Sequence, residues 1–281
     1  MTWHAALDYH QRHGLAHVLA TQVTAQGSTP REPGARMVVT LNRVFDTLGG
    51  GTFEWQTIDA ARRYLTENRT GFHLEAFSLG GRSGQCCGGF VNVLLEVFAE
   101  APTTLAVFGA GHVGRHVIAL SAPFGWQRYW FDSRPDAFRT APDDARLTCS
   151  PLEDIRLRVA SLSPGSHVLV VTHSHDEDYA LIEALIERND LGSIGLIGSD
   201  SKWASFQARL RRAGCSSAQI ARIRCPIGVI NGAKSSNKAP YAIALSVVAE
   251  LAALSDTPQQ TSTRGLDGAP LRALFDTART S

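Results

Sequence analysis

The sequence predicts an α/β protein of two domains, in which a mixed α+β domain is followed by a doubly wound parallel sheet. The chain has 281 residues, a natural length for two domains of roughly 100 to 200 residues each. A Pro-containing connector at residues 99–103 follows one strand-like run and precedes another. After this connector, strand and helix patterns alternate, which is typical of a parallel sheet covered by helices on both faces.

The first domain, residues 1–99, mixes helix and strand patterns. Helices are expected at 3–13 and 53–68, the second because its apolar residues recur at the spacing of one helical face. The run 90–98 is apolar enough to be a central strand of a sheet. The other strands of this domain are expected at 16–24, 37–41, 44–47 and 72–79.

The second domain, residues 103–255, contains the alternating pattern, and the polar composition of residues 256–281 predicts a flexible tail. Repeated strand–helix units favour a parallel sheet of Rossmann-like, doubly wound topology. Strands are expected at 104–108, 127–131, 145–149, 167–172 and 193–197. Helices are expected at 112–122, 152–162, 177–188, 202–213 and 238–254.

Composition and charge exclude several classes of protein. The net charge of +1 leaves no excess of positive charge to neutralise a nucleic acid. No segment approaches the roughly 20 consecutive apolar residues of a membrane span, and the N-terminus lacks the pattern of a secretory signal. Five cysteines, an odd number, do not indicate a disulfide framework. We therefore expect a soluble, cytoplasmic protein that binds neither nucleic acid nor membrane.

The sharpest motif, Gly-Ala-Gly-His-Val-Gly at residues 109–114, follows a predicted strand and opens a predicted helix. In this setting the three glycines permit a tight turn, the approach of a phosphate and close packing of the helix. Asp132 ends the next strand, where a carboxylate could hold a ribose hydroxyl. We expect a phosphate or nucleotide site, although the glycines could simply pack the turn. The candidate binding residues are Gly109, Gly111, His112, Gly114 and Asp132.

Two histidines, His173 and His175, follow the predicted strand 167–172 at the carboxyl edge of the sheet. Ligands of open α/β folds bind at this edge. A metal would need further ligands, and none stands at a recognisable spacing. We expect neutral histidines that hydrogen-bond a polar ligand, with capping of the next helix by Asp176 as the alternative interpretation of this segment.

Three loops of the first domain are rich in glycine and polar residues. The loop 26–36 combines hydroxyls, arginines and glycines, which suit an anionic, oxygen-rich ligand. The glycines 49–51 precede a predicted helix, so their amides could face an anion. The candidate residues are Ser28, Thr29, Arg31, Gly34, Arg36, Gly49, Gly50, Gly51, Glu54, Gln85, Cys86, Cys87 and Gly88.

The adjacent thiols Cys86 and Cys87 do not suit one zinc site made by protein ligands, because successive side chains of an extended backbone point apart. One thiol could face a ligand while the other packs in the core. A glycine-flanked thiolate suits a soft metal centre or the transfer of sulfur. Two buried cysteines that act as small hydrophobic residues are the alternative.

Eight ordered motifs over about residues 1–254 resemble the XdhC family of xanthine dehydrogenase accessory proteins. Together they are far more specific than the glycine motif alone. The motifs begin at Gln26, Gly49, Gly84, Phe108, Phe131, Thr172, Gly195 and Cys225.

The resemblance implies a non-catalytic chaperone that carries the molybdenum cofactor, molybdopterin or its cytidine dinucleotide form. Such a chaperone would protect the cofactor while a cysteine desulfurase helps exchange an oxo ligand for sulfur. It would then insert the cofactor into xanthine dehydrogenase or a related molybdenum hydroxylase. The resemblance also implies a homodimer. The residues agree with this role, since a helix N-terminus suits the phosphate, polar loops suit the pterin and a thiol suits the metal.

Two other functions remain open from the residues. The motif 109–114 together with Asp132 could belong to an NAD(P)-dependent oxidoreductase, but no substrate-side proton relay is recognisable. A sulfur-transfer enzyme would carry a persulfide on Cys86 or Cys87. We rank the chaperone first, because only this function uses the loops of both domains.

Overall fold

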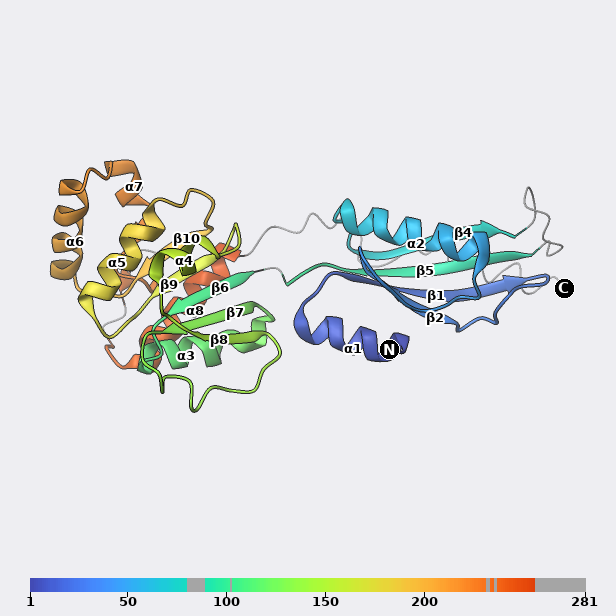
Figure 1. Ribbon diagram of the computed structural model, residues 1–281, viewed down its shortest axis with the longest axis horizontal. Coiled ribbons are helices and arrows are strands. Elements are labelled where there is room, and N and C mark those ends of the chain that lie inside the picture. The colour runs from blue at the N-terminus through green and yellow to red at the C-terminus, as the bar shows by residue number, and fades with distance from the viewer. Residues whose placement is uncertain (80–88, 102, 231–232, 235–236, 256–281) are drawn as a thin grey trace. The chain divides into compact units, whose positions relative to one another are not determined.

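The computed structural model describes residues 1–79, 89–101, 103–230, 233–234 and 237–255 (Figure 1). The chain divides into two compact units, with the break between Glu100 and Ala101. The expected fold class is confirmed, because the first unit contains an antiparallel sheet with helices and the second a parallel sheet with helices. Gln85, Cys86, Cys87, Gly88 and the tail 256–281 lie outside the described residues.

The first unit is built on a five-stranded antiparallel sheet of order β3-β2-β1-β5-β4. Strand β5 pairs with β1 on one side and β4 on the other, so the apolar run predicted as a central strand is an interior one. The strands are β1 (His17–Gln26), β2 (Arg36–Val39), β3 (Val44–Asp46), β4 (Gly71–Ser78) and β5 (Phe90–Phe98).

Two helices pack on opposite faces of this sheet, because successive side chains of a strand point to opposite faces. Helix α2 (Gly51–Thr66) shares a core with Val18 and Ala20 of β1, whereas α1 (Trp3–His13) packs on Leu19. Burial of a large side chain such as Phe53, which is 4% exposed, contributes about 2 kcal/mol. Helix α2 begins two residues before the predicted start, at the last glycine of the 49–51 loop.

The second unit is a six-stranded parallel sheet of order β11-β10-β9-β6-β7-β8. The chain builds β6, β7 and β8 outward in one direction and then returns to place β9 on the other side of β6. This reversal is a topological switch point, where open α/β sheets bind ligands. The strands are β6 (Thr104–Phe108), β7 (Gln127–Asp132), β8 (Leu147–Pro151), β9 (His167–Val170), β10 (Ser193–Leu196) and β11 (Ile223–Arg224).

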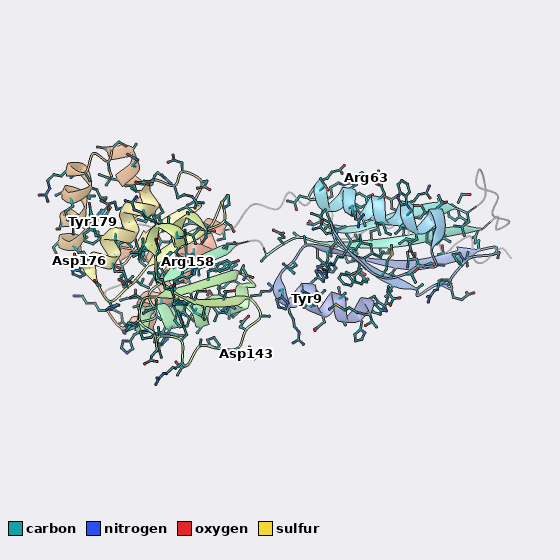
Figure 2. The ribbon with its side chains drawn as sticks, in the orientation of Figure 1. Tyr9, Arg63, Asp143, Arg158, Asp176 and Tyr179 are labelled. Carbon is teal, nitrogen blue, oxygen red and sulfur yellow. The ribbon has the colours of Figure 1, made fainter. Side chains whose placement is uncertain are left out.

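Helices cover both faces of the parallel sheet. One core contains side chains of α4 (Ile155–Ala160), α5 (His175–Ile186), α6 (Asp200–Arg212) and α7 (Ser217–Ala221). The other contains side chains of α3 (His112–Ser121) and α8 (Pro240–Ser255). On the first face, the ring of Tyr179 (labelled in Figure 2) packs edge-on to Phe206, and its centre lies 3.6 Å from the Arg209 guanidinium carbon.

Several element boundaries of the second unit differ from the predictions, and some of the observed starts lie where a side chain caps or turns the backbone. Strand β8 begins at Leu147, since Asp144 accepts from the Arg146 amide and holds a turn before it. Helix α4 begins at Ile155 after its cap Asp154, and α5 begins at His175 after its cap Ser174.

Short elements complete the second unit: η1 (Ala122–Phe124), β12 (Val229–Ile230) and β13 (Ala233–Lys234). Within the described ranges, no helix is both long and apolar enough to cross a lipid bilayer.

Candidate functional site

The glycine turn at residues 109–111 joins β6 to α3 at the switch point of the parallel sheet. Gly109 has a φ of 119°, and a Cβ added to it would lie 2.3 Å from the carbonyl oxygen of Val171. A Cβ added to Gly114 would lie 2.0 Å from the carbonyl oxygen of Gly109, so α3 packs directly on the turn. Gly111 differs, because a Cβ added there meets no atom of the described structure within 4 Å. The turn is therefore tightly packed on its inner side and open at Gly111.

The N-terminus of α3 is also open. Its first turn contains no acidic residue, and within the described ranges no side chain caps it. The first amides of a helix lack partners within the helix and carry a partial positive charge, which favours a bound anion. The backbone around Gly111 and His112 is thus suited to a phosphate, the ligand that the sequence predicts here.

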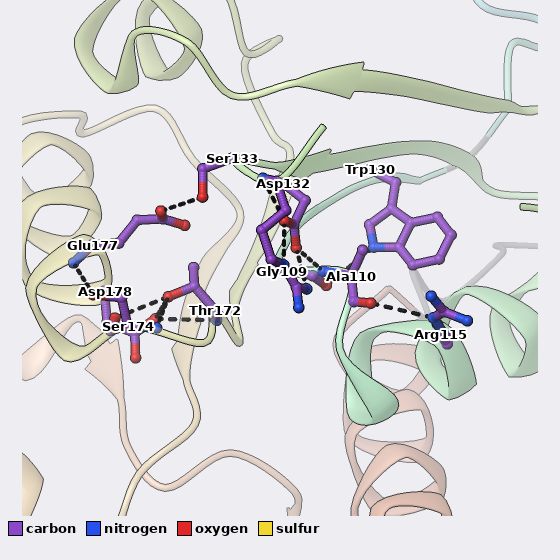
Figure 3. A network of polar contacts seen from close by, with 11 residues as sticks. Gly109, Ala110, Arg115, Trp130, Asp132, Ser133, Thr172, Ser174, Glu177 and Asp178 are labelled. Carbon is purple, nitrogen blue, oxygen red and sulfur yellow. Dashed lines mark hydrogen bonds and ion pairs between the residues drawn. The ribbon is translucent and has the colours of Figure 1, made fainter. Parts of the chain in front are cut away.

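Asp132 supports this turn from the neighbouring strand β7 (Figure 3). Its Oδ2 accepts from the Ala110 amide at 2.6 Å and from Arg134 Nη2 at 2.8 Å. Its Oδ1 accepts from the Arg134 amide at 2.9 Å and from Arg134 Nε at 2.8 Å. Burial opposes ionisation of this carboxyl, but the bonds from Arg134 and Ala110 dominate and lower the pKa of Asp132 to about 2.

These contacts give Asp132 a role that the sequence did not indicate. A carboxylate has about four acceptor positions, and Asp132 uses four with its side chain only 1% exposed. The predicted hydrogen bond to a ribose hydroxyl would require the exchange of one of them. In this structure Asp132 orders the glycine turn.

A second polar network orders the carboxyl ends of β9 and β10. The amide and hydroxyl of Thr172 donate to Asp178 Oδ1 at 3.1 and 2.8 Å. Lys202 Nζ donates to Asp178 Oδ2 at 2.5 Å and to the Ile197 carbonyl at 2.9 Å. The side chains of Asp178 and Lys202 are 1% and 10% exposed, so this is a buried ion pair between α5 and α6.

Neither Asp178 nor Lys202 was predicted from the sequence as a site residue. One signal was available, because Lys202 is one of only three lysines in the chain and stands at the start of a helix after a predicted strand. Its partner, 24 residues earlier, has no feature that separates it from the other acidic residues of the segment 176–178.

A further bond ties β7 to α5. Ser133 Oγ donates to Glu177 Oε2 at 2.7 Å, while the Glu177 amide donates to the capping hydroxyl of Ser174 (Figure 3). The ends of β7 and β9 are thereby held together around the switch point. The histidines predicted as ligand contacts, His112, His173 and His175, are exposed. Among the described residues, no group of three or more His, Cys, Asp or Glu side chains could hold a metal ion.

In the first unit, the loops 26–36 and 49–51 meet. A Cβ added to Gly49 would lie 2.6 Å from Pro30 Cβ, and one added to Gly89 would lie 2.7 Å from the carbonyl oxygens of Gln26 and Ser28. Leu79 and Gly89, which flank the undescribed residues 80–88, are joined by a hydrogen bond of 2.8 Å from the Leu79 amide. Gly89 therefore lies beside the 26–36 loop and is hydrogen-bonded to Leu79.

The turn at glycines 49–51 binds a carboxylate of the protein, that of Glu54. Their φ angles are 119°, 80° and 75°, and Glu54 Oε2 accepts from the amides of Leu48 and Gly50 at 2.8 and 3.0 Å and from the Thr47 hydroxyl. Burial alone would raise the pKa of Glu54, but the bonds from Thr47 and these amides lower it. Among the amides that the sequence predicts to face an anion, that of Gly50 donates to Glu54, whereas that of Gly49 donates to the Thr47 hydroxyl.

The remaining predicted residues of this unit lie either in the 26–36 loop or, in the case of Arg36, beside helix α1. Thr29 Oγ1 and Gln22 Nε2 both donate to the Arg31 carbonyl, at 3.0 and 2.8 Å, and the Gly34 amide donates to the Gln22 carbonyl at 2.8 Å. Gln22, fully buried and not selected from the sequence, thus anchors the loop that carries Ser28. Arg36 is used elsewhere, with its guanidinium 4.9 Å from the centre of the Trp3 ring of α1.

Two family models match this chain. The model of the XdhC Rossmann domain matches residues 105–251, and the model of the XdhC and CoxI family matches residues 10–77. The chain belongs to the XdhC family. The Rossmann match spans the glycine turn, Asp132 and the Asp178–Lys202 pair, and the match in the first unit spans the loops 26–36 and 49–51. The resemblance inferred from the eight sequence motifs is confirmed.

Relatives of this XdhC-family chain differ in length. It is 29% identical over 240 residues to the uncharacterised protein YqeB of Escherichia coli K12, covering 83% of this chain and 42% of that protein. The chain therefore spans less than half the length of this curated relative. A solved structure described as a xanthine dehydrogenase from Bacillus halodurans is 19% identical, with a TM-score of 0.45 and coverage of 94% and 98% of the two chains. A structure of chuY from E. coli CFT073 is 14% identical, with a TM-score of 0.32 and coverage of 56% and 91%.

Proposed function

We propose that this chain is a maturation factor that binds the molybdenum cofactor as cargo and delivers it to xanthine dehydrogenase or a related molybdenum hydroxylase. Membership of the XdhC family supports the role of accessory protein. The observation that carries the proposal is the open glycine turn before α3. There the backbone faces free space at Gly111, and the first helical turn has no acidic residue.

The terminal phosphate of molybdopterin fits the chemistry of this turn. A phosphate carries up to two negative charges and accepts several hydrogen bonds, which are the properties that helix N-termini bind. Asp132 accepts from the Ala110 amide and so stabilises the turn. Gly114, the third glycine, lets α3 pack directly on the turn, so the first amides of α3 lie next to it. We infer that the turn before α3 would bind the phosphate end of the cofactor.

The pterin and the metal of the cofactor need side chains of different chemistry. The exposed loop around Ser28 and Arg31 supplies hydroxyl and guanidinium donors for a flat heterocycle rich in acceptors. Cys86 or Cys87 would supply a thiolate, a ligand that suits a soft metal. When bound, the cofactor supplies the redox chemistry of the acceptor enzyme, and this chain binds, orients and shields it.

The proposed partners follow from this carrier role. A cysteine desulfurase would deliver sulfur to the cargo while the carrier holds it, and the acceptor hydroxylase would then receive the cargo. The carrier would work in the cytoplasm as a homodimer and act as an insertion factor rather than as an enzyme. Each encounter requires only that the bound cofactor remains accessible at its metal end.

The experiment that tests the proposal measures bound pterin by fluorescence. Protein purified from a molybdenum-replete host is denatured and oxidised, and about one pterin per chain is expected. Gly111→Asp should lose at least about tenfold of the pterin, since it places a negative charge at the proposed phosphate site. Aspartate is also a favourable N-cap residue, so the melting temperature should not fall.

Gly111→Asn is the matched control for this substitution. Asparagine has the same shape and a similar capping preference as aspartate but no charge, so its pterin content should lie between those of the wild type and Gly111→Asp. Equal pterin in all three proteins would exclude a phosphate site at Gly111. Absence of pterin from the wild type, together with binding of NAD in a calorimeter, would instead favour the oxidoreductase that the glycine motif also predicts.

A further inference from the structure

Strand β4 forms one edge of the antiparallel sheet of the first unit, and its outer side is unpaired. Within the described part of the chain, β5 pairs with one side of β4 and no strand pairs with the other. Just beyond β4, the Leu79 amide donates to the carbonyl of Gly89, which stands opposite it. The backbone groups of an antiparallel strand point alternately to its two sides. The amides and carbonyls of residues 72, 74 and 76 therefore point to the free side.

The two edges of this sheet differ in their protection against further pairing. Strand β3, at the other edge, has only three residues, and a short edge strand is one means by which proteins prevent the addition of another strand. Strand β4 has eight residues, a regular register with β5 and neither proline nor lysine. Its one carboxylate, that of Glu75, accepts from the Tyr64 hydroxyl of α2. The free edge of β4 thus lacks the features that block an added strand.

A groove with a volume of about 400 Å³ lies between this edge and helix α2. Residues of both elements line it, among them Trp55, Asp59, Arg63, Glu75, Ala76 and Phe77. Trp55 is 66% exposed, although tryptophan is largely buried on average. Asp59 and Arg63, the latter labelled in Figure 2, are also exposed. We call Trp55, Asp59 and Arg63, which are spaced four apart, the α2 row.

The α2 row has the spacing of an extended chain. Residues four apart on a helix are separated by about 6 Å along its axis, and alternate residues of a strand by about 6.6 Å. Helix α2 and strand β4 run in opposite directions. Near the helix start, the Phe53 and Phe77 ring centres are 5.5 Å apart, and near its end Tyr64 stacks on His73 at 4.3 Å. A strand added to β4 would therefore place every second side chain beside one member of the α2 row.

We propose that the free edge of β4 and the α2 row bind an extended peptide segment of a partner protein, which joins the sheet as an antiparallel strand. From its N-terminus, the segment presents an apolar, a basic and an acidic side chain at alternate positions. These contact Trp55, Asp59 and Arg63 in turn, because a chain antiparallel to β4 runs in the same direction as α2. Main-chain hydrogen bonds to the edge supply affinity, and the three side-chain contacts supply specificity.

Backbone and charge together favour this occupant. Unpaired amides and carbonyls in a row are satisfied by another extended main chain, which neither a helix nor a small molecule supplies. Asp59 and Arg63 are complementary in charge to a basic and an acidic side chain two positions apart. A second copy of β4 does not fit, because its own sequence on this face is His73, Glu75 and Phe77. In the register that fills the α2 row, Glu75 of that copy would oppose Asp59.

Fluorescence anisotropy of labelled peptides, titrated with the full chain, measures this binding. The probe is Ser-Thr-Leu-Thr-Lys-Thr-Glu-Thr-Ser, in which threonine, a favourable strand residue, separates the three contacts. We expect a Kd in the micromolar range. A second peptide, with the lysine and glutamate exchanged, has the same composition but opposes like charges at Asp59 and Arg63. It should bind at least about tenfold more weakly.

Reversal of the two charges of the α2 row should reverse this preference. The double variant Asp59→Lys with Arg63→Glu should bind the exchanged peptide within about threefold of the wild-type Kd for the original one, and the original at least about tenfold more weakly. Trp55→Ala should raise the Kd of both peptides about tenfold. The matched control is Asp8→Lys with Arg12→Glu, the same exchange in an exposed pair four apart on α1, which should leave both Kd values unchanged.

Strand pairing is tested by methylation of the peptide backbone. In the proposed register the threonine amides point to β4, whereas the lysine amide points away from it. A methyl group on the amide nitrogen of the threonine between leucine and lysine should raise the Kd at least about tenfold, because it removes a hydrogen bond and blocks the approach of the strand. A methyl group on the lysine amide should change the Kd by less than about threefold.

Four results would overturn the proposal. They are no binding of the original peptide to the wild type, equal affinity for the original and exchanged peptides, equal effects of the two methylations, and a wild-type dimer in sedimentation equilibrium that the peptide dissociates. The last result would identify a second copy as the occupant. Circular dichroism shows whether each variant is folded. Because the peptides bind without a cofactor, loss of the pterin from the chain leaves these measurements unchanged.

Discussion

The two units of this protein each place a glycine turn before a helix and use it differently. In the first unit the glycines 49–51 precede α2, and Glu54 of the same helix binds back to the amides of Leu48 and Gly50. In the second unit the glycines 109 and 111 precede α3, where Arg115 stands at the helical position that corresponds to Glu54. Arg115 Nε donates to the Ala110 carbonyl at 3.2 Å and thereby braces the turn.

In the first unit a carboxylate of the protein itself binds the glycine turn, whereas the first turn of α3 in the second unit contains no acidic residue. A carboxylate one turn into the helix binds to its own N-terminal amides and competes with any external anion. An arginine at that position leaves the amides available. In the second unit the supporting carboxylate comes instead from β7, where Asp132 contacts the Ala110 amide and lies on the sheet side of the turn. The following predictions test this difference, from the largest expected effect to the smallest.

Gly109→Ala should destabilise the second unit by about 4 kcal/mol, because the penalty for a left-handed φ adds to the overlap with the Val171 carbonyl. The measurement is urea denaturation followed by tryptophan fluorescence. Gly165→Ala is the control, since Gly165 has a φ of 77° and no atom of the described structure near its Cβ position. It should lose only about 1 kcal/mol. Equal losses in the two variants would show that the turn is not tightly packed.

Lys202→Met should destabilise the second unit by about 3 kcal/mol, because it leaves the buried Asp178 carboxylate without its cation. The double variant with Asp178→Asn should recover more than half of this loss, since the asparagine oxygen can still accept from Thr172. Denaturation of all three variants measures the coupling between the residues. Additive losses would mean that the two groups do not interact, despite their distance of 2.5 Å.

Asp132→Asn should destabilise the second unit by about 2 kcal/mol at neutral pH, as expected from a carboxyl whose pKa lies nearly two units below its ordinary value. Because the pKa is lowered in the folded state, this contribution is present above the ordinary carboxyl pKa. It is lost as the pH falls towards 2. The difference in unfolding free energy between wild type and variant should therefore shrink between pH 5 and pH 2.

Asp143→Asn provides the control for this pH dependence. Asp143 is exposed in the loop before β8, so the substitution should change stability by less than about 0.5 kcal/mol at every pH (Figure 2). A constant difference for Asp132→Asn across the same range would show that its carboxylate is not stabilised by Arg134 and the Ala110 amide.

Glu54→Gln should cost about 1 kcal/mol and open the α2 turn to external anions. Since the folded-state pKa of Glu54 is lowered, its contribution is present above the ordinary carboxyl pKa and disappears in acid. Added sulfate should raise the melting temperature of Glu54→Gln more than that of the wild type. Asp59→Asn, an exposed change on the same helix, should show no extra response to sulfate.

Much of the architecture follows from short stretches of sequence. The two-part fold, the order of the longer strands and helices and the turn at 109–114 were predictable, because strand and helix patterns and glycine requirements depend on neighbouring residues. The short elements α7 and β11 were not predicted. Some boundaries moved where a single polar side chain, such as Asp154 or Ser174, caps the start of a helix. Family membership was equally visible, since it rests on the order of motifs.

The sequence predicted where the candidate sites lie along the chain but not which contacts their residues make. The sequence determined that glycine turns precede α2 and α3 and that polar residues follow β7 and β9. Tertiary structure decided that Glu54 binds to the first turn, that Asp132 is committed to Arg134 and Ala110, and that Lys202 pairs with Asp178. The physical reason is that a turn is selected by the conformations of a few adjacent residues. A hydrogen-bond partner is selected by which distant groups the folded sheet brings within about 3 Å.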